Sequence, residues 1–343
     1  MAVIKSLTVR CEEKGRMAFV MREMNDEPEG NEILLKTAYN VISPGTELSR
    51  ILDTHTKHVP FPCMTGYLTE GTVEAVGPDV KNLKVGDYVR CGNSNMARYN
   101  TSADNCRLIT EDVRPGSAAY AGLMAIPLRG IRNAKVRMGD TVLVFGMGPI
   151  GLFAAMWAKA DGAATVIGVD PIAYRRDLAL KLGADITADP GSDDLTAIVK
   201  AHNEDGANVV IDATGTTRVI ADTFQYAAQY GRIAVLGGIH GKVEVDLYSN
   251  FQKRNLTMVG CGSNRPEDYP YDNSDTEEKA ILKMIERGMI DPYPALTYAP
   301  VADAIDCYSH LIKRDADVIT YCIDWSEADA LQAELGELET WDI

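Results

Sequence analysis

Three glycines between residues 146 and 151 have the spacing best suited to a chemical role in this chain. They form a Gly-x-Gly-x-x-Gly pattern that follows the apolar run Thr141–Phe145 and precedes a segment with helical periodicity. In this context the first glycine permits a tight turn, the second lets the backbone approach a pyrophosphate, and the third lets the helix pack closely on the strand. The start of that helix also favours phosphate through its free N–H groups and its dipole. The loop therefore predicts a dinucleotide site whose contacts are Gly146, Gly148, Pro149, Ile150 and Gly151.

An acidic residue supports this interpretation. Asp170 ends the next apolar run, Thr165–Val169, and lies 19 positions after Gly151. A carboxylate there can accept both ribose hydroxyls of NAD and repels the additional phosphate of NADP, so we expect NAD as the cofactor. Arg175 and Arg176 follow closely, and one of them could stack on adenine or favour a 2′-phosphate.

Later strand ends add further candidate cofactor contacts. Ligands of open parallel sheets bind at the carboxyl ends of the strands, where this chain has polar or small residues after three apolar runs. Ordinary turns between strands and helices explain such residues equally well. The candidates are Thr214, Gly237 and Ser263.

The surrounding sequence predicts the elements that must position these residues. The first third alternates apolar and polar residues, as β-strands do, and helical spacing follows over residues 117–134. The middle third alternates short apolar runs with helical segments, which predicts right-handed βαβ units and a parallel sheet. The expected strands there are 141–145, 165–169, 208–211, 232–236 and 256–259, and the expected helices are 149–159, 173–182, 195–202 and 217–230. The fold class is therefore α/β, a β-rich part combined with a doubly wound parallel-sheet domain.

Composition narrows the functional classes. The net charge of -15 makes nucleic acid an unlikely partner, because an acidic surface repels phosphate backbones. No apolar run reaches the roughly 18 residues of a membrane helix, and residues 1–10 do not resemble a signal peptide, so we expect a cytoplasmic protein without membrane association. The seven cysteines are widely spaced and include no Cys-x-x-Cys pair, which favours buried thiols over a disulfide framework or a clustered zinc site.

Several weak motifs in a fixed order are jointly specific. They are Gly71-Thr72-Val73-Glu74-Ala75-Val76-Gly77, Val85-Gly86-Asp87-Tyr88-Val89, Gly139-Asp140-Thr141-Val142-Leu143-Val144 and the glycine fingerprint. Over roughly residues 5–325 the chain resembles the medium-chain dehydrogenase/reductase superfamily, in particular its sorbitol and threonine dehydrogenase-like branch. The resemblance implies a GroES-like catalytic domain over 1–121 with 263–343, a Rossmann domain over 122–262, an active site in the cleft between them, and a homodimer or homotetramer.

The sequence departs from that branch where a catalytic zinc is usually bound. The segment that usually carries a cysteine ligand is Ile42-Ser43-Pro44-Gly45-Thr46-Glu47, without a thiol. Tyr67 stands in place of the usual histidine, Gly122 aligns with the third ligand, and the four-cysteine lobe of the structural zinc is absent. Zinc needs three protein ligands to act as a Lewis acid, so we expect zinc-independent hydride transfer. An unexpected site could still be formed by neighbouring donors, namely Cys63, Glu70, His55 and His58.

Without zinc, a side chain must take or share the proton of the alcohol. Tyr67 is the main candidate, and a phenol needs a nearby cation or hydrogen-bond donor to act as a base. His55, Lys57 and His58 could supply that help. Thr46 matches a proton-relaying hydroxyl of zinc relatives, and Glu47 could orient the site or bind a substrate hydroxyl. Each candidate also has a purely structural explanation: Tyr67 could only pack in the wall of the cleft, and residues 55–58 could form an ordinary polar loop. Asn264 and Arg265 could contact nicotinamide or substrate, or they could lie on the surface.

The branch resembled, together with Asp170, favours NAD-dependent oxidation of a secondary alcohol in a sugar, polyol or cyclitol, a small hydroxylated substrate. Two alternatives remain. One is a zinc-less enoyl or quinone reductase that uses NADPH, against which Asp170 argues. The other is a non-catalytic nucleotide-binding protein that kept the fold.

Overall fold

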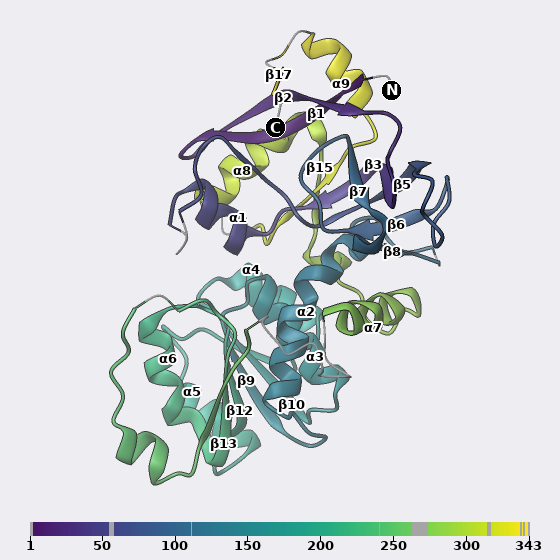
Figure 1. The fold of residues 1–343 in the computed structure, drawn as a ribbon. Coiled ribbons are helices and arrows are strands. Elements are labelled where there is room, and N and C mark those ends of the chain that lie inside the picture. The colour runs from purple at the N-terminus through teal and green to yellow at the C-terminus, as the bar shows by residue number, and fades with distance from the viewer. Residues whose placement is uncertain are drawn as a thin grey trace. The chain divides into compact units, whose positions relative to one another are not determined.

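The fold comes from a computed structural model, which describes residues 3–54, 58–110, 112–239, 241–262, 274–313, 317–336, 338 and 340–341. The chain forms two compact units (Figure 1). Unit 1 comprises residues 1–122, 282–289 and 296–343, and unit 2 comprises residues 123–281 and 290–295. Two helices contribute residues to both units, α2 (Ser117–Asn133) and α7 (Ser274–Glu286).

Unit 1 is β-rich, as the alternating pattern of the first third predicts. A four-stranded sheet has the order β17-β2-β1-β4, and a seven-stranded sheet has the order β15-β16-β3-β5-β6-β8 with β7 also paired to β3. Its strands are β1 (Val3–Glu13), β2 (Arg16–Asn25), β3 (Glu32–Val41), β4 (Cys63–Met64), β5 (Thr69–Val76), β6 (Tyr88–Cys91), β7 (Arg98–Ser102), β8 (Cys106–Leu108), β15 (Thr297–Pro300), β16 (Tyr321–Asp324) and β17 (Thr340–Trp341). Its helices are α1 (Pro44–Ile51), α8 (Ala304–Lys313) and α9 (Ala328–Leu335), with short turns η1 (Ala103–Asn105) and η5 (Val301–Asp303).

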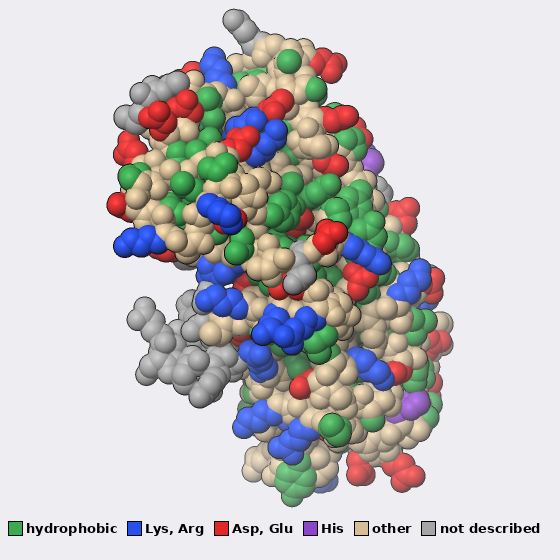
Figure 2. Space-filling view, turned by 90° about the vertical axis from the view of Figure 1, so that its right-hand side faces the viewer, with side chains coloured by type: hydrophobic (Ala, Val, Ile, Leu, Met, Phe, Trp, Pro, Cys, Tyr) green, Lys and Arg blue, Asp and Glu red, His purple; other side chains and the backbone are tan. Residues whose placement is uncertain are grey.

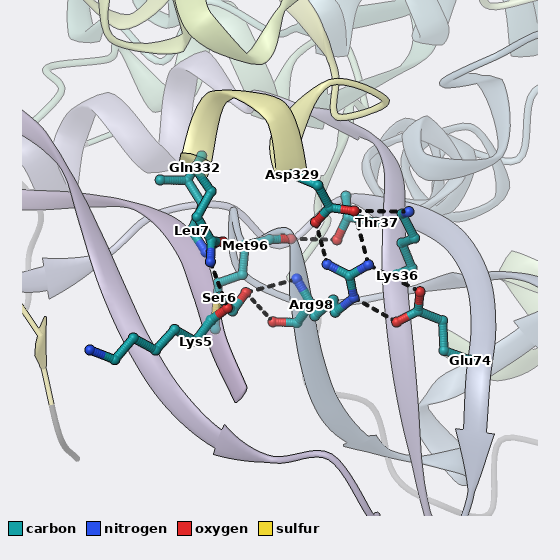
Figure 3. Close-up of polar contacts among 10 residues, drawn as sticks. All are labelled: Lys5, Ser6, Leu7, Lys36, Thr37, Glu74, Met96, Arg98, Asp329 and Gln332. Atoms are coloured by element: carbon teal, nitrogen blue, oxygen red, sulfur yellow. Dashed lines mark hydrogen bonds and ion pairs between the residues drawn. The ribbon is translucent and has the colours of Figure 1, made fainter. Parts of the chain in front are cut away.

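The carboxyl-terminal helix α9 is fixed to the strands of unit 1 by polar side chains (Figure 3). The Arg98 guanidinium on β7 donates to the Glu74 carboxylate at 2.7 Å and to Asp329 of α9 at 3.1 Å. Gln332 accepts the Leu7 N–H and donates to the Lys5 carbonyl, each at 3.1 Å. Arg98 lowers the pKa of Asp329 to about 2, so this contact stays charged at neutral pH.

Unit 2 is a doubly wound α/β domain, as the middle third of the sequence predicts. Its six strands are all parallel, in the order β11-β10-β9-β12-β13-β14. The strands are β9 (Thr141–Phe145), β10 (Thr165–Val169), β11 (Ile186–Ala188), β12 (Ala207–Asp212), β13 (Ala227–Val235) and β14 (Thr257–Gly260). The helices are α3 (Pro149–Ala160), α4 (Ala173–Lys181), α5 (Leu195–His202) and α6 (Thr217–Thr223), with the short 3-10 helices η2 (Phe224–Tyr226) and η4 (Tyr293–Ala295) and the π-helix η3 (Leu247–Gln252).

This strand order has one topological switch point. Chain order reverses between the adjacent strands β9 and β12, and the crevice outside their carboxyl ends is where such sheets bind ligands. The glycine loop follows β9 and Thr214 follows β12, so both candidate segments lie at that crevice. The strands themselves are almost entirely buried, which explains why they read as continuous apolar runs rather than as alternating ones.

Some elements differ from the sequence-based expectation. The helix expected over 217–230 ends at Thr223, because Ala227 and the residues after it enter β13 beside β12. The short helix α1 was not expected. The unit boundary also differs from the predicted domains, since residues 274–281 of α7 belong to unit 2, where the Glu277 carboxylate accepts from the Arg129 guanidinium at 2.6 Å with both side chains buried.

Acidic residues are spread over the sequence rather than concentrated in one part of it. Figure 2 shows Asp and Glu side chains at several separate places on the face in view, with Lys and Arg side chains among them. Within the described part of the chain, no helix is long and apolar enough to span a membrane.

Candidate functional site

The glycine loop of unit 2 has the backbone geometry that its sequence predicts. Gly146 has a φ of +86°, and a Cβ added there would lie 2.8 Å from the Thr214 methyl group. A Cβ on Gly151 would lie 1.7 Å from the Gly146 carbonyl oxygen, so only glycine lets α3 start this close to β9. Gly148 is the N-cap of α3, and a Cβ there would meet no atom within 4 Å. The space beside Gly148 is therefore open to a ligand.

Asp170 is tied to this loop. It is almost fully buried at the end of β10, where its carboxylate accepts the Met147 N–H at 2.8 Å and the Ile172 N–H at 2.9 Å. One Nη atom of Arg175 lies 3.8 Å from the same carboxylate, and Arg176 donates to the Asp170 carbonyl at 2.7 Å. A carboxylate oxygen has two lone-pair sites, so these contacts leave Asp170 with capacity to accept ribose hydroxyls.

The turn after β12 forms the other side of the crevice. Asp212 accepts the Thr214 N–H at 3.0 Å and the Thr214 hydroxyl at 2.6 Å. Gly237 packs against this turn, because its added Cβ would lie 2.2 Å from the Gly215 nitrogen. The fold thus brings Thr214 and Gly237 to the glycine loop, whereas Ser263 lies outside the described residues. Sequence reasoning missed Asp212, the buried acid that shapes the turn, although its position at the end of an apolar run was a usable signal.

Unit 1 supplies a second cluster of polar side chains around α1. Ser43 is the N-cap of this helix and Pro44 occupies its first turn, where proline is well accommodated. The Tyr67 hydroxyl donates to the Ser43 hydroxyl at 2.6 Å and also hydrogen-bonds to the Thr46 side chain. The structure therefore brings together Tyr67 and Thr46, two predicted site residues, and adds Ser43, which the sequence analysis did not select.

Glu47 serves this cluster through the backbone. Its buried carboxylate accepts the Ser43 N–H at 2.7 Å, the Gly66 N–H at 2.9 Å and the Tyr308 hydroxyl. Burial raises the pKa of Glu47. Of the two roles predicted for Glu47, orienting the site agrees with these contacts. Binding a substrate hydroxyl stays a prediction, for which one lone-pair site remains on the oxygen that accepts the Ser43 N–H.

Glu70 holds the start of α2. Its fully buried carboxylate accepts the Gly116 N–H at 2.7 Å, the Ala119 N–H at 2.8 Å and the Tyr88 hydroxyl at 2.9 Å. An acid at this place satisfies helix N–H groups that lack a carbonyl partner and faces the positive end of the helix dipole. Burial raises the pKa of Glu70, so desolvation outweighs these hydrogen bonds.

These contacts decide how well unit 1 fits a catalytic zinc. Gly122 cannot be a side-chain ligand, and a Cβ added there would lie 1.9 Å from an Nη atom of Arg90, so a cation covers this position. The Glu70 oxygens accept hydrogen bonds from backbone and tyrosine, and Tyr67 pairs with Ser43. Within the described ranges, no group of three or more His, Cys, Asp or Glu side chains could hold a metal ion. The described residues of this region do not fit a zinc site.

The loop candidates for assisting Tyr67 are only partly described. His58 is exposed and its ring Nδ1 lies 2.8 Å from the Asp53 carboxylate, so it pairs away from the tyrosine. His55 and Lys57, as well as Asn264 and Arg265, lie outside the described residues. Among the described residues, Arg50 near the end of α1 supplies positive charge that acts on Tyr67.

Burial sets the acidity of Tyr67. It raises the pKa of the phenol above its usual value of about 10, while the hydrogen bonds to Ser43 and Thr46 and the charge of Arg50 lower it and the charge of Glu47 raises it. Tyr67 is therefore a neutral phenol at neutral pH. In that state it can donate a proton or a hydrogen bond, and it acts as a base only when the pH is high.

Two family models match the chain over most of its length. Residues 29–143 match the alcohol dehydrogenase GroES-like domain, and residues 149–276 match the zinc-binding dehydrogenase model. The chain belongs to the medium-chain dehydrogenase/reductase superfamily, as the sequence motifs predict.

Curated relatives share over a quarter of the aligned residues. An L-threonine 3-dehydrogenase of Caldanaerobacter subterraneus is 28% identical over 243 residues, which are 61% of this chain and 69% of the relative. A D-guloside 3-dehydrogenase of Escherichia coli is 28% identical over 251 residues, which are 68% of this chain and 71% of the relative.

Solved structures share the fold. A zinc-binding dehydrogenase from Sinorhizobium meliloti bound to NADP has a TM-score of 0.80 at 20% identity and covers 94% of this chain and 99% of its own. A short chain alcohol dehydrogenase from Escherichia coli complexed with NADH also has a TM-score of 0.80, at 18% identity. The match covers 93% of this chain and 99% of that chain. These likenesses establish the GroES-like and Rossmann folds of the two units.

Proposed function

We propose that this protein is a nicotinamide-dependent dehydrogenase that reversibly oxidises a secondary alcohol of a sugar, polyol or cyclitol, with NAD preferred and without a catalytic zinc. Relatives that oxidise hydroxylated small molecules support the substrate class. Neighbours bound to NADP and NADH support a nicotinamide cofactor. The soluble assembly we expect is a homodimer or homotetramer, which light scattering after size-exclusion chromatography tests.

The hydrogen bond between Tyr67 and Ser43 is the observation that carries the zinc-independent part of this proposal. It joins the two segments that, by the resemblance, would carry the cysteine and histidine ligands in a zinc enzyme, and both side chains in the bond are hydroxyls rather than metal ligands. Glu47 joins the same segments a second time through the N–H groups of Ser43 and Gly66. The site is thus built to hold a tyrosine hydroxyl in place.

Proton transfer then falls to Tyr67. A bound nicotinamide would supply the hydride acceptor or donor, and the Tyr67 phenol would exchange a proton with the substrate oxygen. Because burial raises the pKa of Tyr67, reduction is favoured at neutral pH, where the phenol is protonated. Oxidation needs the deprotonated phenol, so its rate should increase as the pH increases from 7 to 10.

The preference for NAD follows from Asp170. Its buried carboxylate is positioned by Met147 of the glycine loop, so the acid and the phosphate-binding backbone form one rigid unit. The nearby Arg175 guanidinium offsets part of the repulsion toward a 2′-phosphate. We therefore expect discrimination against NADP rather than its exclusion.

The first experiment measures NAD reduction with a panel of polyols, sugars and cyclitols, using enzyme treated with a chelator and assayed for metal. Turnover without metal supports the proposal, whereas activity that disappears on chelation and returns with zinc contradicts it. The variant Tyr67→Phe should lower kcat by about 100-fold or more, the range of general acid–base catalysis. Tyr248→Phe, at an exposed tyrosine of unit 2, is the matched control and should leave kcat unchanged. Equal activity of both variants would exclude Tyr67 as the proton-transfer group.

A further inference from the structure

Two cysteines far apart in the sequence lie directly opposite each other in unit 1. Cys11 of β1 is the antiparallel partner of Cys63 of β4, and the two thiols act on each other's pKa, while the Cys11 thiol donates to the Glu13 carbonyl at 3.2 Å. Directly opposed residues of antiparallel strands have Cβ atoms about 4.5–5.5 Å apart, whereas a disulfide needs about 3.5–4.5 Å, so a bond requires a small approach of the two strands. Both thiols are free in this structure.

The position of β4 leaves room for the small adjustment that a bond requires. It has only two residues and is the terminal strand of the order β17-β2-β1-β4. Both cysteines are buried, Cys11 fully and Cys63 with 7% of its surface exposed, so an oxidant would reach Cys63 through this short terminal strand.

The two sulfurs are also chemically unequal. The hydrogen bond from Cys11 lowers the pKa of Cys63 to about 7, and the positive charge of Arg50 acts in the same direction. The same interaction, together with burial and the charge of Glu12, raises the pKa of Cys11. Cys63 is thus the thiolate of the pair and Cys11 is the thiol that can resolve it.

We propose that Cys11 and Cys63 form a reversible dithiol–disulfide pair that reacts with hydroperoxides. The Cys63 thiolate attacks the terminal oxygen of the hydroperoxide, the O–O bond breaks, an alcohol or water leaves, and Cys63 becomes a sulfenic acid. The sulfur of Cys11 then attacks the sulfur of Cys63, an S–S bond forms, the S–O bond breaks, and water carries away the thiol proton. The two thiols lose two electrons and two protons in total, and the hydroperoxide is reduced.

A second opposed pair in the same unit provides an internal comparison. Cys91 of β6 faces Cys106 of β8 in register, and the Cys91 sulfur lies 2.9 Å from the Tyr99 hydroxyl. Here the neighbouring Cys91 thiol and then burial raise the pKa of Cys106, as the Cys63 thiol and burial do for Cys11, while the charges of Arg107 and Arg90 oppose this shift. Because the Tyr99 hydroxyl already occupies the Cys91 sulfur, we expect this pair to react after Cys11 and Cys63.

The bond would also affect the proposed site. Cys63 precedes Tyr67 by four residues, and Thr65 between them donates its hydroxyl to the Val9 carbonyl of β1 at 2.8 Å. A disulfide would therefore fasten the segment that carries Tyr67 covalently to β1. This inference does not depend on the proposed activity, because thiols can be counted without a substrate.

The test treats the native, full-length protein with a small excess of hydrogen peroxide, quenches it, and counts thiols after denaturation. We expect the count to decrease from seven to five, peptide mapping to find a Cys11–Cys63 crosslink within one chain, and dithiothreitol to restore all seven thiols. A count that stays at seven, or a first crosslink between Cys91 and Cys106, would overturn the proposal.

Variants test the order of steps. Cys11→Ser should leave Cys63 as a sulfenic acid that dimedone traps, whereas Cys63→Ser should prevent both trapping at this pair and crosslinking. Cys106→Ser is the matched control and should still form the Cys11–Cys63 bond. Trapping of a sulfenic acid at Cys11 instead of Cys63 would contradict the assignment of the thiolate. If a variant does not fold, peptide mapping of the wild-type protein still shows whether the Cys11–Cys63 bond forms.

Discussion

The glycine loop of unit 2 and the Tyr67 cluster of unit 1 are both organised by buried acids, but the acids reach their partners over different distances in the sequence. Asp170 accepts N–H groups from Met147 and Ile172, which are 23 and 2 positions away. Glu47 accepts the Tyr308 hydroxyl from 261 positions away, and Glu70 accepts the Gly116 N–H from 46 positions away. One site is a local motif, whereas the other exists only after the chain has folded.

This difference has a functional meaning. We expect the loop to bind its ligand through the backbone, so its requirements concern small residues and one carboxylate, which occur together in the sequence. We expect the Tyr67 cluster to act through side chains, which must be held at set distances by several elements. Substitutions in the two regions should therefore differ in how they affect cofactor binding and stability.

The largest effect is expected at Gly151. Gly151→Ala would place a Cβ 1.7 Å from the Gly146 carbonyl, so we expect loss of dinucleotide binding together with a destabilisation of about 3 kcal/mol or more. NADH fluorescence titration and urea unfolding measure the two effects. Gly148→Ala is the matched control, because its Cβ meets no protein atom and should weaken NADH binding without lowering stability. If both variants lose stability equally, the distinction between Gly151 as a packing residue and Gly148 as a ligand-facing residue is wrong.

The next effect is expected at Glu70. Glu70→Ala leaves two buried N–H groups and the Tyr88 hydroxyl without their acceptor, which should destabilise the protein by roughly 2–4 kcal/mol. Chemical denaturation measures this, with Glu204→Ala at an exposed residue as control. Retention of full stability would mean that the start of α2 does not depend on this carboxylate, which would remove the contrast between the two regions.

A smaller change is expected at Asp170. Asp170→Ala removes the acceptor for the ribose hydroxyls and should weaken NAD about tenfold, while the remaining Arg175 favours NADP. The ratio of kcat/KM for NAD and NADP measures the shift. Asp189→Ala, which removes an ion pair of Arg176 at 3.2 Å, is the control and should leave the ratio unchanged. An unchanged ratio in Asp170→Ala would show that the buried acid serves only the loop.

The smallest effect concerns pH. Because the folded-state pKa of Glu70 is raised above the unfolded value of about 4.3, the folded protein holds this proton more tightly. The contribution of Glu70 to the free energy of unfolding therefore decreases as the pH increases from about 4.3 toward the raised pKa. Glu70→Gln cannot titrate, so its stability relative to the wild type should improve between pH 5 and pH 8 in urea unfolding. A relative stability that worsens over this range would contradict the raised pKa.

Residue patterns located the parallel sheet closely and the β-rich unit less well. The runs at 141–145 and 165–169 coincide with β9 and β10, because buried parallel strands are apolar on both faces. Helix α1 was missed, since it has only eight residues and begins with Pro44 and Gly45. Its position depends on Glu47 and on packing against α8, neither of which is a local signal.

By itself, the sequence determined the α/β class, the dinucleotide loop with its acid, the superfamily, and the absence of the usual zinc ligands at the matching positions. These properties depend on residues that are close together in the chain or on the identity of single residues. Only the tertiary structure decided that Tyr67 bonds to Ser43, that Glu47 and Glu70 are enclosed by backbone N–H groups, and that Cys11 faces Cys63. Except for the bond of Glu47 to the Ser43 N–H, four positions away, those contacts join residues 19 to 52 positions apart, and the register of the strands and the packing of the helices bring them together.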